Sequence, residues 1–160
     1  MLYDTSKLRR QDRALPQEEA FQLLKDAEYG ILCMQHFNGG GYGIPLNYAW
    51  DGDSSLYMHC AHEGFKLNCL AKEPRVTFVI TGATRLLPNQ FSTAYESVMV
   101  HGEAQVVTGE AERQRALHLL IQRLLPQEIE RGKKYIAGAA HATTVIRLSI
   151  SRICGKAHRV

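Results

Sequence analysis

The sequence predicts a mainly β (α+β) fold in which six antiparallel strands form a small barrel with helices at its periphery. Apolar runs of strand length are separated by turn-forming residues at 38–41 and 51–53, as in successive hairpins. Helical patterns are inserted between other runs. A long alternating run at 95–107 carries Gly102 in its middle, which suits the bend of a barrel corner. Closure into a barrel removes the exposed edges that such strands would otherwise present.

The first part of the chain is predicted to hold an arm, a helix and three strands. Residues 1–14 are charged and lack periodicity, so we expect an extended arm that lies on a surface. Pro16, followed by acidic residues, is typical of a helix start, and the predicted helix covers 16–28. The strands are expected at 29–35, 42–50 and 56–60.

The middle of the chain is predicted to hold a helix at 65–72, a buried strand at 75–81 and a loop at 82–91. In the long strand at 95–107, one face is apolar and is predicted to be core: Val98, Val100, Gly102, Ala104 and Val106. The opposite face is mixed and should meet water, a ligand or a second subunit: Ser97, Met99, His101, Glu103 and Gln105.

The last part of the chain is predicted to hold two helices and a final strand. Thr108 is placed to cap a helix that ends before Pro126. A weaker helix is expected at 127–137. The final strand, at 143–153, alternates between apolar and polar residues, which indicates one buried face and one open face.

Composition and charge limit the classes of protein to which the chain can belong. A chain of 160 residues, 45% hydrophobic and 22% charged, is ordinary for a folded protein and predicts one domain over 1–160. The net charge of +3 is too small to indicate a nucleic-acid partner. An apolar run of about 18 residues, as a membrane span requires, is absent, and so is an apolar secretion leader. The four scattered cysteines are typical of reduced thiols in the cytoplasm.

A strand-to-helix corner at 56–66 is the stretch that most favours a ligand site. Gly64 allows a sharp turn and lets a ligand approach the main chain. The helix that follows starts with free N–H groups and a partial positive charge, which suit a phosphate. Lys66 would add a full positive charge in the first turn. The alternative interpretation is a plain corner with a surface lysine.

Pro45 lies inside the second predicted strand. A proline cannot donate a hydrogen bond to a neighbouring strand, so it marks an edge or a bulge. Main-chain groups freed there can bind a ligand, and Asn47 adds an amide on the same face. An ordinary edge strand is the alternative.

Several motifs occur in a characteristic order, at 8–13, 43–48, 56–66, 95–102 and 153–156. They read LRRQDR, GIPLNY, LYMHCAHEGFK, YESVMVHG and ICGK. In this order the chain resembles the FMN-binding split barrels related to pyridoxamine 5′-phosphate oxidase, and within them the 5-nitroimidazole-resistance (Nim-type) proteins. Cys154 replaces the threonine that is common in the family, and Cys60 replaces a small hydroxyl residue. Either change could retune the pocket, but neither should block flavin binding.

The resemblance implies a homodimer that binds FMN, with FAD as another option, at the subunit interface. The phosphate would lie at the strand-to-helix corner, against His59, Cys60, Ala61, Gly64 and Lys66. The isoalloxazine would lie along the second strand, at Ile44, Pro45, Leu46, Asn47 and Tyr48. The partner subunit would contribute Ser97, Val98, Met99, His101, Lys156 and Arg159. His59 would take part in catalysis, or would only orient the phosphate or the ring.

These implications predict a flavin-dependent reductase of nitroaromatic or other small electrophilic substrates, without a nucleic-acid or membrane partner. The source of electrons stays open, because the sequence has no dinucleotide motif. An alternative is a non-catalytic flavin or haem binder, in which His59, His62 or His101 ligates iron. A zinc site from His59, Cys60 and His62 is disfavoured, because adjacent strand residues point to opposite faces. A pyridoxine-phosphate oxidase proper ranks lower, because its arginine-rich C-terminal motif is not clearly present.

Overall fold

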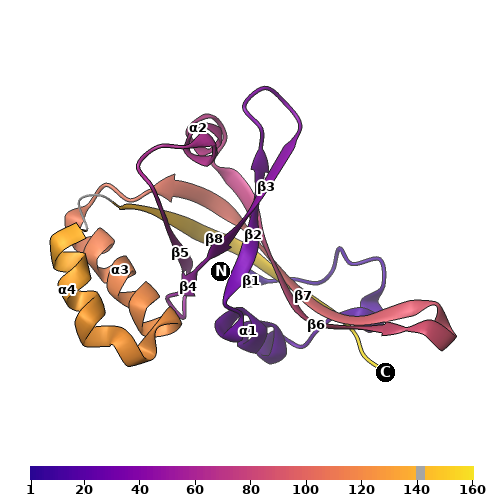
Figure 1. The fold of residues 1–160 in the computed structure, drawn as a ribbon. Coiled ribbons are helices and arrows are strands. Elements are labelled where there is room, and N and C mark those ends of the chain that lie inside the picture. Colours follow the sequence, from indigo (N-terminus) through magenta and orange to yellow (C-terminus); the bar gives the residue numbers. More distant parts are fainter. Residues whose placement is uncertain (140–142) are drawn as a thin grey trace.

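The computed structural model describes residues 1–139 and 143–160, and shows a curled antiparallel sheet with helices at its periphery (Figure 1). The predicted mainly β fold with peripheral helices is therefore confirmed. The elements in chain order are β1 (Leu2–Tyr3), η1 (Gln11–Arg13), α1 (Gln17–Asp26), β2 (Tyr29–Gln35), β3 (Gly41–Asn47), β4 (Ala49–Trp50), β5 (Ser55–Cys60), α2 (Phe65–Lys72), β6 (Arg75–Leu87), η2 (Pro88–Gln90), β7 (Ser92–Val106), α3 (Glu110–Leu124), η3 (Pro126–Glu128), α4 (Ile129–Ala139) and β8 (Thr144–His158).

The strands form one sheet in the order β3-β2-β6-β7-β8-β5-β4. Every neighbouring pair along this path is antiparallel, and β1 adds to β8 in parallel. In the part of the chain that the structure describes, the hydrogen-bonded path ends at β3 and at β4 without returning on itself. The barrel is therefore split, and β3 is an edge strand.

Tyr48 is the point at which the chain crosses from one edge of the sheet to the other. The single strand predicted at 42–50 divides there into β3, which pairs with β2, and β4, which pairs with β5. Tyr48 is buried, and its hydroxyl donates a hydrogen bond to the Leu24 carbonyl oxygen in α1. This division adds one strand, and the pairing of Leu2 and Tyr3 with β8 adds another, β1. The sheet therefore has eight strands, and the predicted number of six is wrong. Pairings of two residues are too short to leave a periodic pattern in the sequence.

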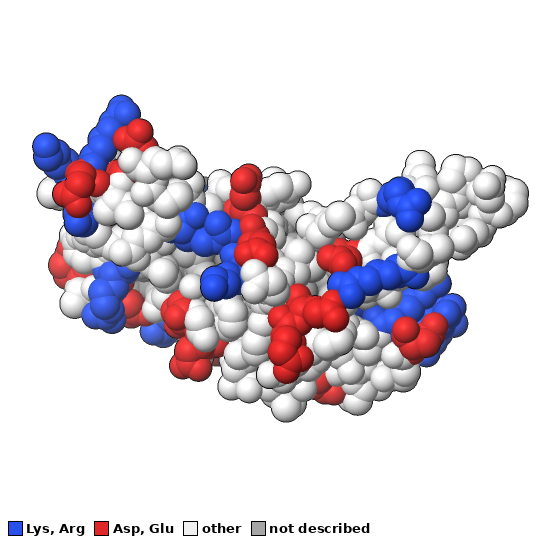
Figure 2. Space-filling model, turned by 90° about the horizontal axis from the view of Figure 1, so that it is seen from below, with Lys and Arg blue, Asp and Glu red and all other residues white. Residues whose placement is uncertain are grey.

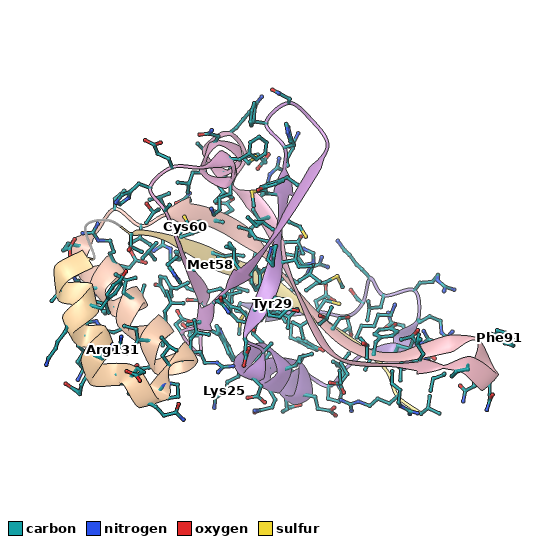
Figure 3. The ribbon with its side chains drawn as sticks, viewed as in Figure 1. Lys25, Tyr29, Met58, Cys60, Phe91 and Arg131 are labelled. Atoms are coloured by element: carbon teal, nitrogen blue, oxygen red, sulfur yellow. The ribbon has the colours of Figure 1, made fainter. Side chains whose placement is uncertain are left out.

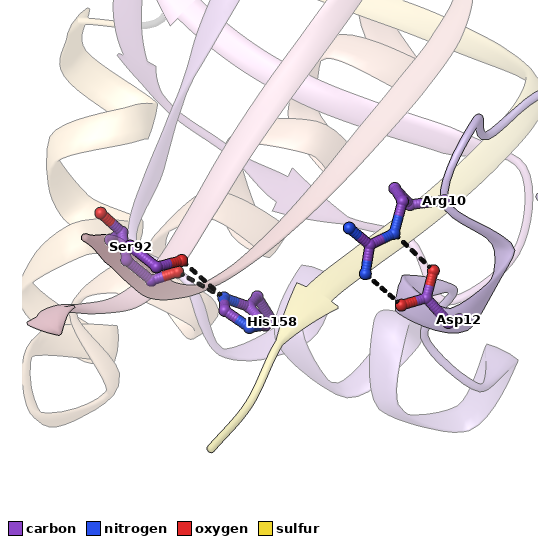
Figure 4. Close-up of polar contacts among 5 residues, drawn as sticks. Arg10, Asp12, Ser92 and His158 are labelled. Atoms are coloured by element: carbon purple, nitrogen blue, oxygen red, sulfur yellow. Dashed lines mark hydrogen bonds and ion pairs between the residues drawn. The ribbon is translucent and has the colours of Figure 1, made fainter. Parts of the chain in front are cut away.

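The N-terminal arm, residues 1–14, lies against β8. The Asp4 amide donates a hydrogen bond to the Ile153 carbonyl oxygen at 2.9 Å. Further along the arm, Arg10 and Asp12 form an ion pair with N–O distances of 2.8 and 2.5 Å (Figure 4). The hydrogen bonds from Arg10 lower the pKa of Asp12 to about 2. The main-chain contact of Asp4 holds the start of the arm beside β8, whereas the Arg10–Asp12 pair lies within the arm.

β6 and β7 form a long hairpin that projects from the body of the molecule (Figure 1). The loop predicted at 82–91 is therefore wrong, since β6 continues to Leu87 and β7 begins at Ser92. Gly82 suggested a break, but the register shift beside it is absorbed as a β-bulge within the paired strands. At the tip, Phe91 adopts a positive φ of 47° and is 99% exposed.

Gly102 lies at the bend that the sequence predicts. The register between β7 and β8 shifts between His101 and Gly102, so Ser151 of β8 has no residue opposite it in β7. A Cβ on Gly102 would lie 2.0 Å from the Ser149 carbonyl oxygen, a separation that no real side chain tolerates. Only glycine therefore lets the two strands approach this closely at the bend.

The apolar face of the long strand is buried at Val98, Val100 and Ala104, as predicted, but Val106 is 45% exposed. β7 ends at Val106, where the chain turns toward α3, and Val107 takes the buried position instead. The prediction for Val106 is wrong because the alternation stops where the strand leaves the sheet.

Two hydrophobic clusters hold the fold together. The larger one fills the barrel interior, and α1 closes one end of it through Ala20 and Leu24. The second cluster lies under α3 and α4 and includes Leu117, Leu120 and Ile136. The space between the helix pair and the barrel thus has an apolar floor of its own.

The helices follow the predicted order with shifts at their ends. α2 has the predicted bounds, and α3 stops at Leu124, two residues before Pro126, as predicted. The N-cap of α3 is Gly109 and makes no side-chain cap, so the prediction that Thr108 caps it is wrong. α4 starts at Ile129 because η3 takes up the residues expected to open it. None of the helices in the described ranges is long and apolar enough to span a membrane.

Candidate functional site

Strands β3, β2, β6, β7 and β8 share a continuous face on the outside of the barrel. Their register places one residue of each strand in a single row across this face: Pro45, Ile31, Val79, Met99 and Cys154. Alternate residues of the same strands belong to the barrel core or pack against it. We call this surface the outer sheet face. It is apolar along the row, and the Ile31 side chain is 40% exposed.

His101 flanks the apolar row on one side. It lies opposite Thr77 in β6, and its Nδ1 is 3.0 Å from the threonine hydroxyl oxygen. Burial lowers the pKa of His101, and the positive charges of Arg152 and Lys7 lower it further. The neutral imidazole is therefore favoured at this position on the outer sheet face.

A serine and a lysine flank the row on the other side. Ser97 of β7 pairs in register with Lys156 of β8, whose Nζ lies 5.5 Å from the centre of the Tyr95 ring. On the edge strand, the Asn47 amide nitrogen donates a hydrogen bond to the Glu28 carbonyl oxygen at 3.0 Å. The outer sheet face therefore combines an apolar centre with polar groups on both sides.

The corner between β5 and α2 lies beside the edge strand β3. The centroid of the Phe65 ring, at the start of α2, is 4.8 Å from that of Tyr42 in β3 and 5.0 Å from that of Phe37. Gly64 is the N-cap of α2 and has φ 148°, which L side chains rarely adopt. The glycine that the sequence singles out is therefore required by the backbone of the corner.

Lys66 brings a positive charge to this corner. Its Nζ is 3.8 Å from the point at which a Cβ on Gly64 would lie. Burial raises the pKa of the Cys60 thiol, and the positive charge of Lys66 partly offsets this rise. The Lys66 ammonium is therefore close enough to influence the end of β5. His62 Nδ1 lies 2.8 Å from the Thr144 hydroxyl oxygen, which ties the corner to β8. A cation beside the first-turn N–H groups of a helix suits an anionic group.

Several predicted site residues turn their side chains inward. They belong to the barrel core or pack against it: Ile44, Leu46, Tyr48, Cys60 and Val98. Figure 3 shows Cys60 near the end of β5. Ala61 is exposed in the corner that follows. A ligand on the outer sheet face can therefore meet the inward-facing residues through their main chain, while Pro45 and Asn47 are exposed.

The His59 side chain points neither to the barrel core nor to the outer sheet face. Cys60 packs against the barrel core, whereas the adjacent His59 lines a cavity of about 370 Å³ beneath α3 and α4. The structure thus separates His59 from the outer sheet face within one chain. Among residues 1–139 and 143–160, no three His, Cys, Asp or Glu side chains are grouped as a metal site would require.

Comparison with known proteins assigns the family. The sequence model described as pyridoxamine 5′-phosphate oxidase matches residues 16–157. The chain belongs to the pyridoxamine 5′-phosphate oxidase family. The match includes β3, the corner and most of the outer sheet face, and it confirms the resemblance seen in the sequence motifs. No curated protein matches the sequence significantly.

Solved structures share the split-barrel fold. A candidate 5-nitroimidazole antibiotic resistance protein from Bacteroides thetaiotaomicron is 19% identical, with TM-score 0.76 over 89% of this chain and 84% of its own. The FAD and haem binding protein from Mycobacterium smegmatis is 18% identical, with TM-score 0.78 over 92% and 74%. The flavocytochrome Anf3 from Azotobacter vinelandii is 22% identical, with TM-score 0.75 over 91% and 68%. At these sequence identities, the structural similarity shows that the chain shares the fold of these proteins.

In this member of the pyridoxamine 5′-phosphate oxidase family, the C-terminal residues are held in place. The Arg159 guanidinium lies 2.7 Å from the Glu96 carboxylate and forms a second ion pair with Glu19. His158 Nδ1 lies 2.8 Å from the Thr93 carbonyl oxygen and 3.4 Å from the Ser92 hydroxyl oxygen, and Figure 4 shows the Ser92 contact. Basic and acidic side chains are intermixed on the face seen in Figure 2. The Arg159 guanidinium is therefore paired with two carboxylates of its own chain.

Sequence reasoning missed the contribution of β2 and β6 to the outer sheet face. Ile31, Cys33, Thr77 and Val79 lie there between the predicted residues of β3 and β7. β2 reads as a nearly continuous apolar run, so its sequence does not distinguish the face that meets the core from the face that is open. Only the pairing register shows which residues point outward.

Tyr48→Phe is expected to lower the free energy of unfolding by about 1 kcal/mol. The substitution deletes the buried hydroxyl that donates to the Leu24 carbonyl oxygen and leaves that acceptor without this donor. Urea unfolding followed by circular dichroism measures the effect. Tyr29→Phe, at a ring that is 56% exposed, is the control and should change stability by less than about 0.5 kcal/mol. If Tyr48→Phe were as stable as the unmodified protein, the hydrogen bond from Tyr48 to Leu24 would not contribute to stability.

Proposed function

We propose that residues 1–160 form a single flavin-binding domain that acts as a homodimer and reduces nitroaromatic or other small electrophilic compounds with reduced FMN or FAD. The match to the pyridoxamine 5′-phosphate oxidase family over residues 16–157 is the observation that carries this proposal. The names of similar structures support it, because they include a FAD and haem binding protein and a candidate 5-nitroimidazole resistance protein.

The corner between β5 and α2 fits the phosphate of a flavin. Gly64 carries no side chain there, and Lys66 Nζ lies 3.8 Å from the position of the missing Cβ. The first-turn N–H groups of α2 face the same end of the helix. In this proposal Lys66 pairs with the phosphate, and the main chain at 61–64 wraps it.

The edge strand β3 fits the ring system of a flavin. An edge strand leaves alternate main-chain N–H and C=O groups unpaired, and Pro45 with Asn47 stands on the open side of β3. Bound flavin would supply the redox chemistry, while the protein orients it and excludes water. Unpaired N–H groups of β3 would stabilise negative charge that develops on the ring.

His59 is the residue that we assign to proton transfer. It lies two residues before the exposed Ala61 of the corner, and its own side chain is exposed. Histidine exchanges protons readily near neutral pH, which suits a general acid. Its imidazole lies on the side of β5 that faces the cavity beneath α3 and α4, so a substrate that receives its proton must approach from that side.

Exposed apolar side chains support the proposed homodimer. Ile31 and Tyr29 are exposed on β2, and Phe91 stands at the tip of the β6–β7 hairpin, away from the barrel (Figure 3). Leu86, on the same hairpin, is 75% exposed. Aromatic and aliphatic groups of this kind are buried when a second subunit covers them.

Ile31→Lys is expected to weaken self-association by about tenfold or more, because it places an unpaired charge in the apolar row of the outer sheet face. Sedimentation equilibrium over a range of protein concentrations measures the effect. Val106→Lys, at an exposed valine at the far end of β7, is the matched control and should leave association unchanged. Equal association of both variants would remove the outer sheet face from the interface.

The absorption spectrum of the purified protein is the first test of the proposed function. We expect flavin bands in the blue, release of FMN or FAD on denaturation, and reoxidation of the photoreduced protein by a 5-nitroimidazole under anaerobic conditions. A colourless protein that does not bind added FMN or FAD would refute flavin binding. A flavin-loaded protein whose reduced form is not oxidised by the nitroimidazole would refute the reductase activity alone.

A non-catalytic binder of flavin or haem is the second candidate. One of the similar structures is a flavocytochrome, and another is a FAD and haem binding protein. His59, His62 and His101 are the candidate iron ligands, although His62 and His101 are hydrogen-bonded to Thr144 and Thr77. A Soret band after addition of haemin, lost in one histidine variant, would support this function.

A further inference from the structure

The cavity beneath the helix pair is formed by α3, α4 and the ends of β5 and β8. Its volume is about 370 Å³, which lies in the range of small-molecule sites. Most of its wall is aliphatic and comes from α3, the residue that follows α3, and α4: Leu117, Leu120, Ile121, Leu124, Leu125 and Ile136. The helix pair stands at the side of the barrel in Figure 1.

Close packing at one point shapes this cavity. A Cβ on Gly132 of α4 would lie 2.6 Å from Ile121 Cδ1 of α3, so the helices meet there with no room for a side chain. Leu117, Leu120 and Ile136 are buried beneath and form the floor. The two helices are therefore in close contact at this point, and the cavity lies between them and the end of β5.

Few polar groups reach the cavity, and they lie at its ends. His59 of β5 and Thr143, beside β8, are at the strand end. The Arg131 side chain, labelled on the helix pair in Figure 3, and Glu128 lie at the helix end, 3.8 Å apart. An apolar wall with a few polar groups is typical of a small-molecule site, and the largely exposed Arg131 side chain lies at the border of this one.

The charge of α4 favours a ligand with a negative group. The helix carries Arg131, Lys133 and Lys134 against Glu130, so three positive charges and one negative charge make a net +2. The carboxylate of Glu128 lies beside Arg131, but a guanidinium has five N–H donors and can bind a second anion. The imidazole of His59 offers a further hydrogen-bond donor at the opposite end.

The cavity adjoins the corner between β5 and α2. His59 lines the cavity and His62 belongs to the corner, where it lies 2.8 Å from the hydroxyl oxygen of Thr144. Thr143, the preceding residue, lines the cavity. The same two chain segments therefore border the cavity and the place proposed for the flavin phosphate.

We propose that this cavity binds a planar aromatic compound of one or two rings with an anionic or nitro group. The ring lies between the leucines of α3 and α4, and its polar group meets Arg131 or His59. This site is distinct from the place proposed for the flavin ring on β3. The binding itself does not require flavin.

The test uses naphthalene-2-sulfonate, a planar aromatic anion of two rings, and isothermal titration calorimetry measures its binding. We expect saturable binding with one site per chain to the flavin-free full-length protein. Leu124→Trp should weaken binding by about tenfold or more, because the larger ring fills the space between the helices. Leu2→Trp, at an exposed leucine of β1 that does not line the cavity, is the matched control and should bind the probe as before.

The same titration, followed by methyl NMR of the unmodified protein, decides the question if Leu124→Trp does not fold. Resonances of Ile121 and Ile136 in the cavity should shift, and that of Ile31 on the outer sheet face should not. Non-saturable binding, unchanged affinity in folded Leu124→Trp, or shifts confined to Ile31 would overturn the proposal. Flavin content is read from the absorbance of a separate, untreated sample, so loss of flavin binding and loss of cavity binding are distinguishable.

Discussion

Replacing Gly102 with valine is expected to lower the free energy of unfolding by about 3 kcal/mol, the upper end for overpacked sites. The Cβ would lie 2.0 Å from the Ser149 carbonyl oxygen and 2.9 Å from Leu148 Cδ2. The first of these atoms belongs to the backbone of β8 and cannot rotate away, so the two central strands would have to separate. Urea unfolding followed by circular dichroism measures the loss.

A second glycine provides the control for this experiment. Gly41 starts β3, and a Cβ built on it would meet nothing within 4 Å. Gly41→Val should therefore change stability by less than about 0.5 kcal/mol. If Gly102→Val were as stable as Gly41→Val, the close approach of β7 and β8 at the bend would be wrong.

Lys66→Ala is expected to weaken flavin binding by about 1.5–3 kcal/mol, or roughly ten- to a hundredfold in the dissociation constant. The variant removes the positive charge that lies beside Gly64 at the start of α2. In the proposed site this charge pairs with the phosphate of FMN or FAD. Titration of flavin-free protein with FMN, followed by quenching of flavin fluorescence, gives the dissociation constant.

Lys72→Ala is the matched control, since Lys72 is the second lysine of α2 and lies at its opposite end. Its Nζ donates a hydrogen bond to the Phe37 carbonyl oxygen at 2.6 Å. The control should keep the affinity of the unmodified protein. Equal affinity of the Lys66→Ala and Lys72→Ala variants for FMN would remove Lys66 from the phosphate site.

Gly64 and Gly102 show which backbone features can be predicted from the local sequence. Gly64 follows a strand and opens a helical pattern, and the structure gives it the positive φ that such a position requires. Gly102 interrupts an alternating run, and the structure places it at a register shift. Gly82 is predicted to open a loop, but it too lies beside a register shift within paired strands, and β6 continues to Leu87. The pairing with the neighbouring strand decides whether a strand ends at such a glycine or continues through a bulge.

The directions of the site side chains show what cannot be predicted from the local sequence. Alternation predicts that Pro45 and Asn47 share a face, but it does not say that this face continues through β2 and β6 to Met99. His59 and Cys60 are adjacent, and their opposite directions follow from strand geometry. That His59 opens into a cavity follows only from where α3 and α4 pack, many residues further along the chain.

The sequence by itself determined the mainly β class, the bounds of α2, the corner at Gly64 and the bend at Gly102. These features follow from periodicity and from the backbone needs of single residues, which neighbouring residues encode. Tertiary structure alone decided the crossing at Tyr48, the row on the outer sheet face and the cavity beside His59. Each depends on strand register and helix packing between distant segments, and such contacts are not encoded in any short stretch of chain.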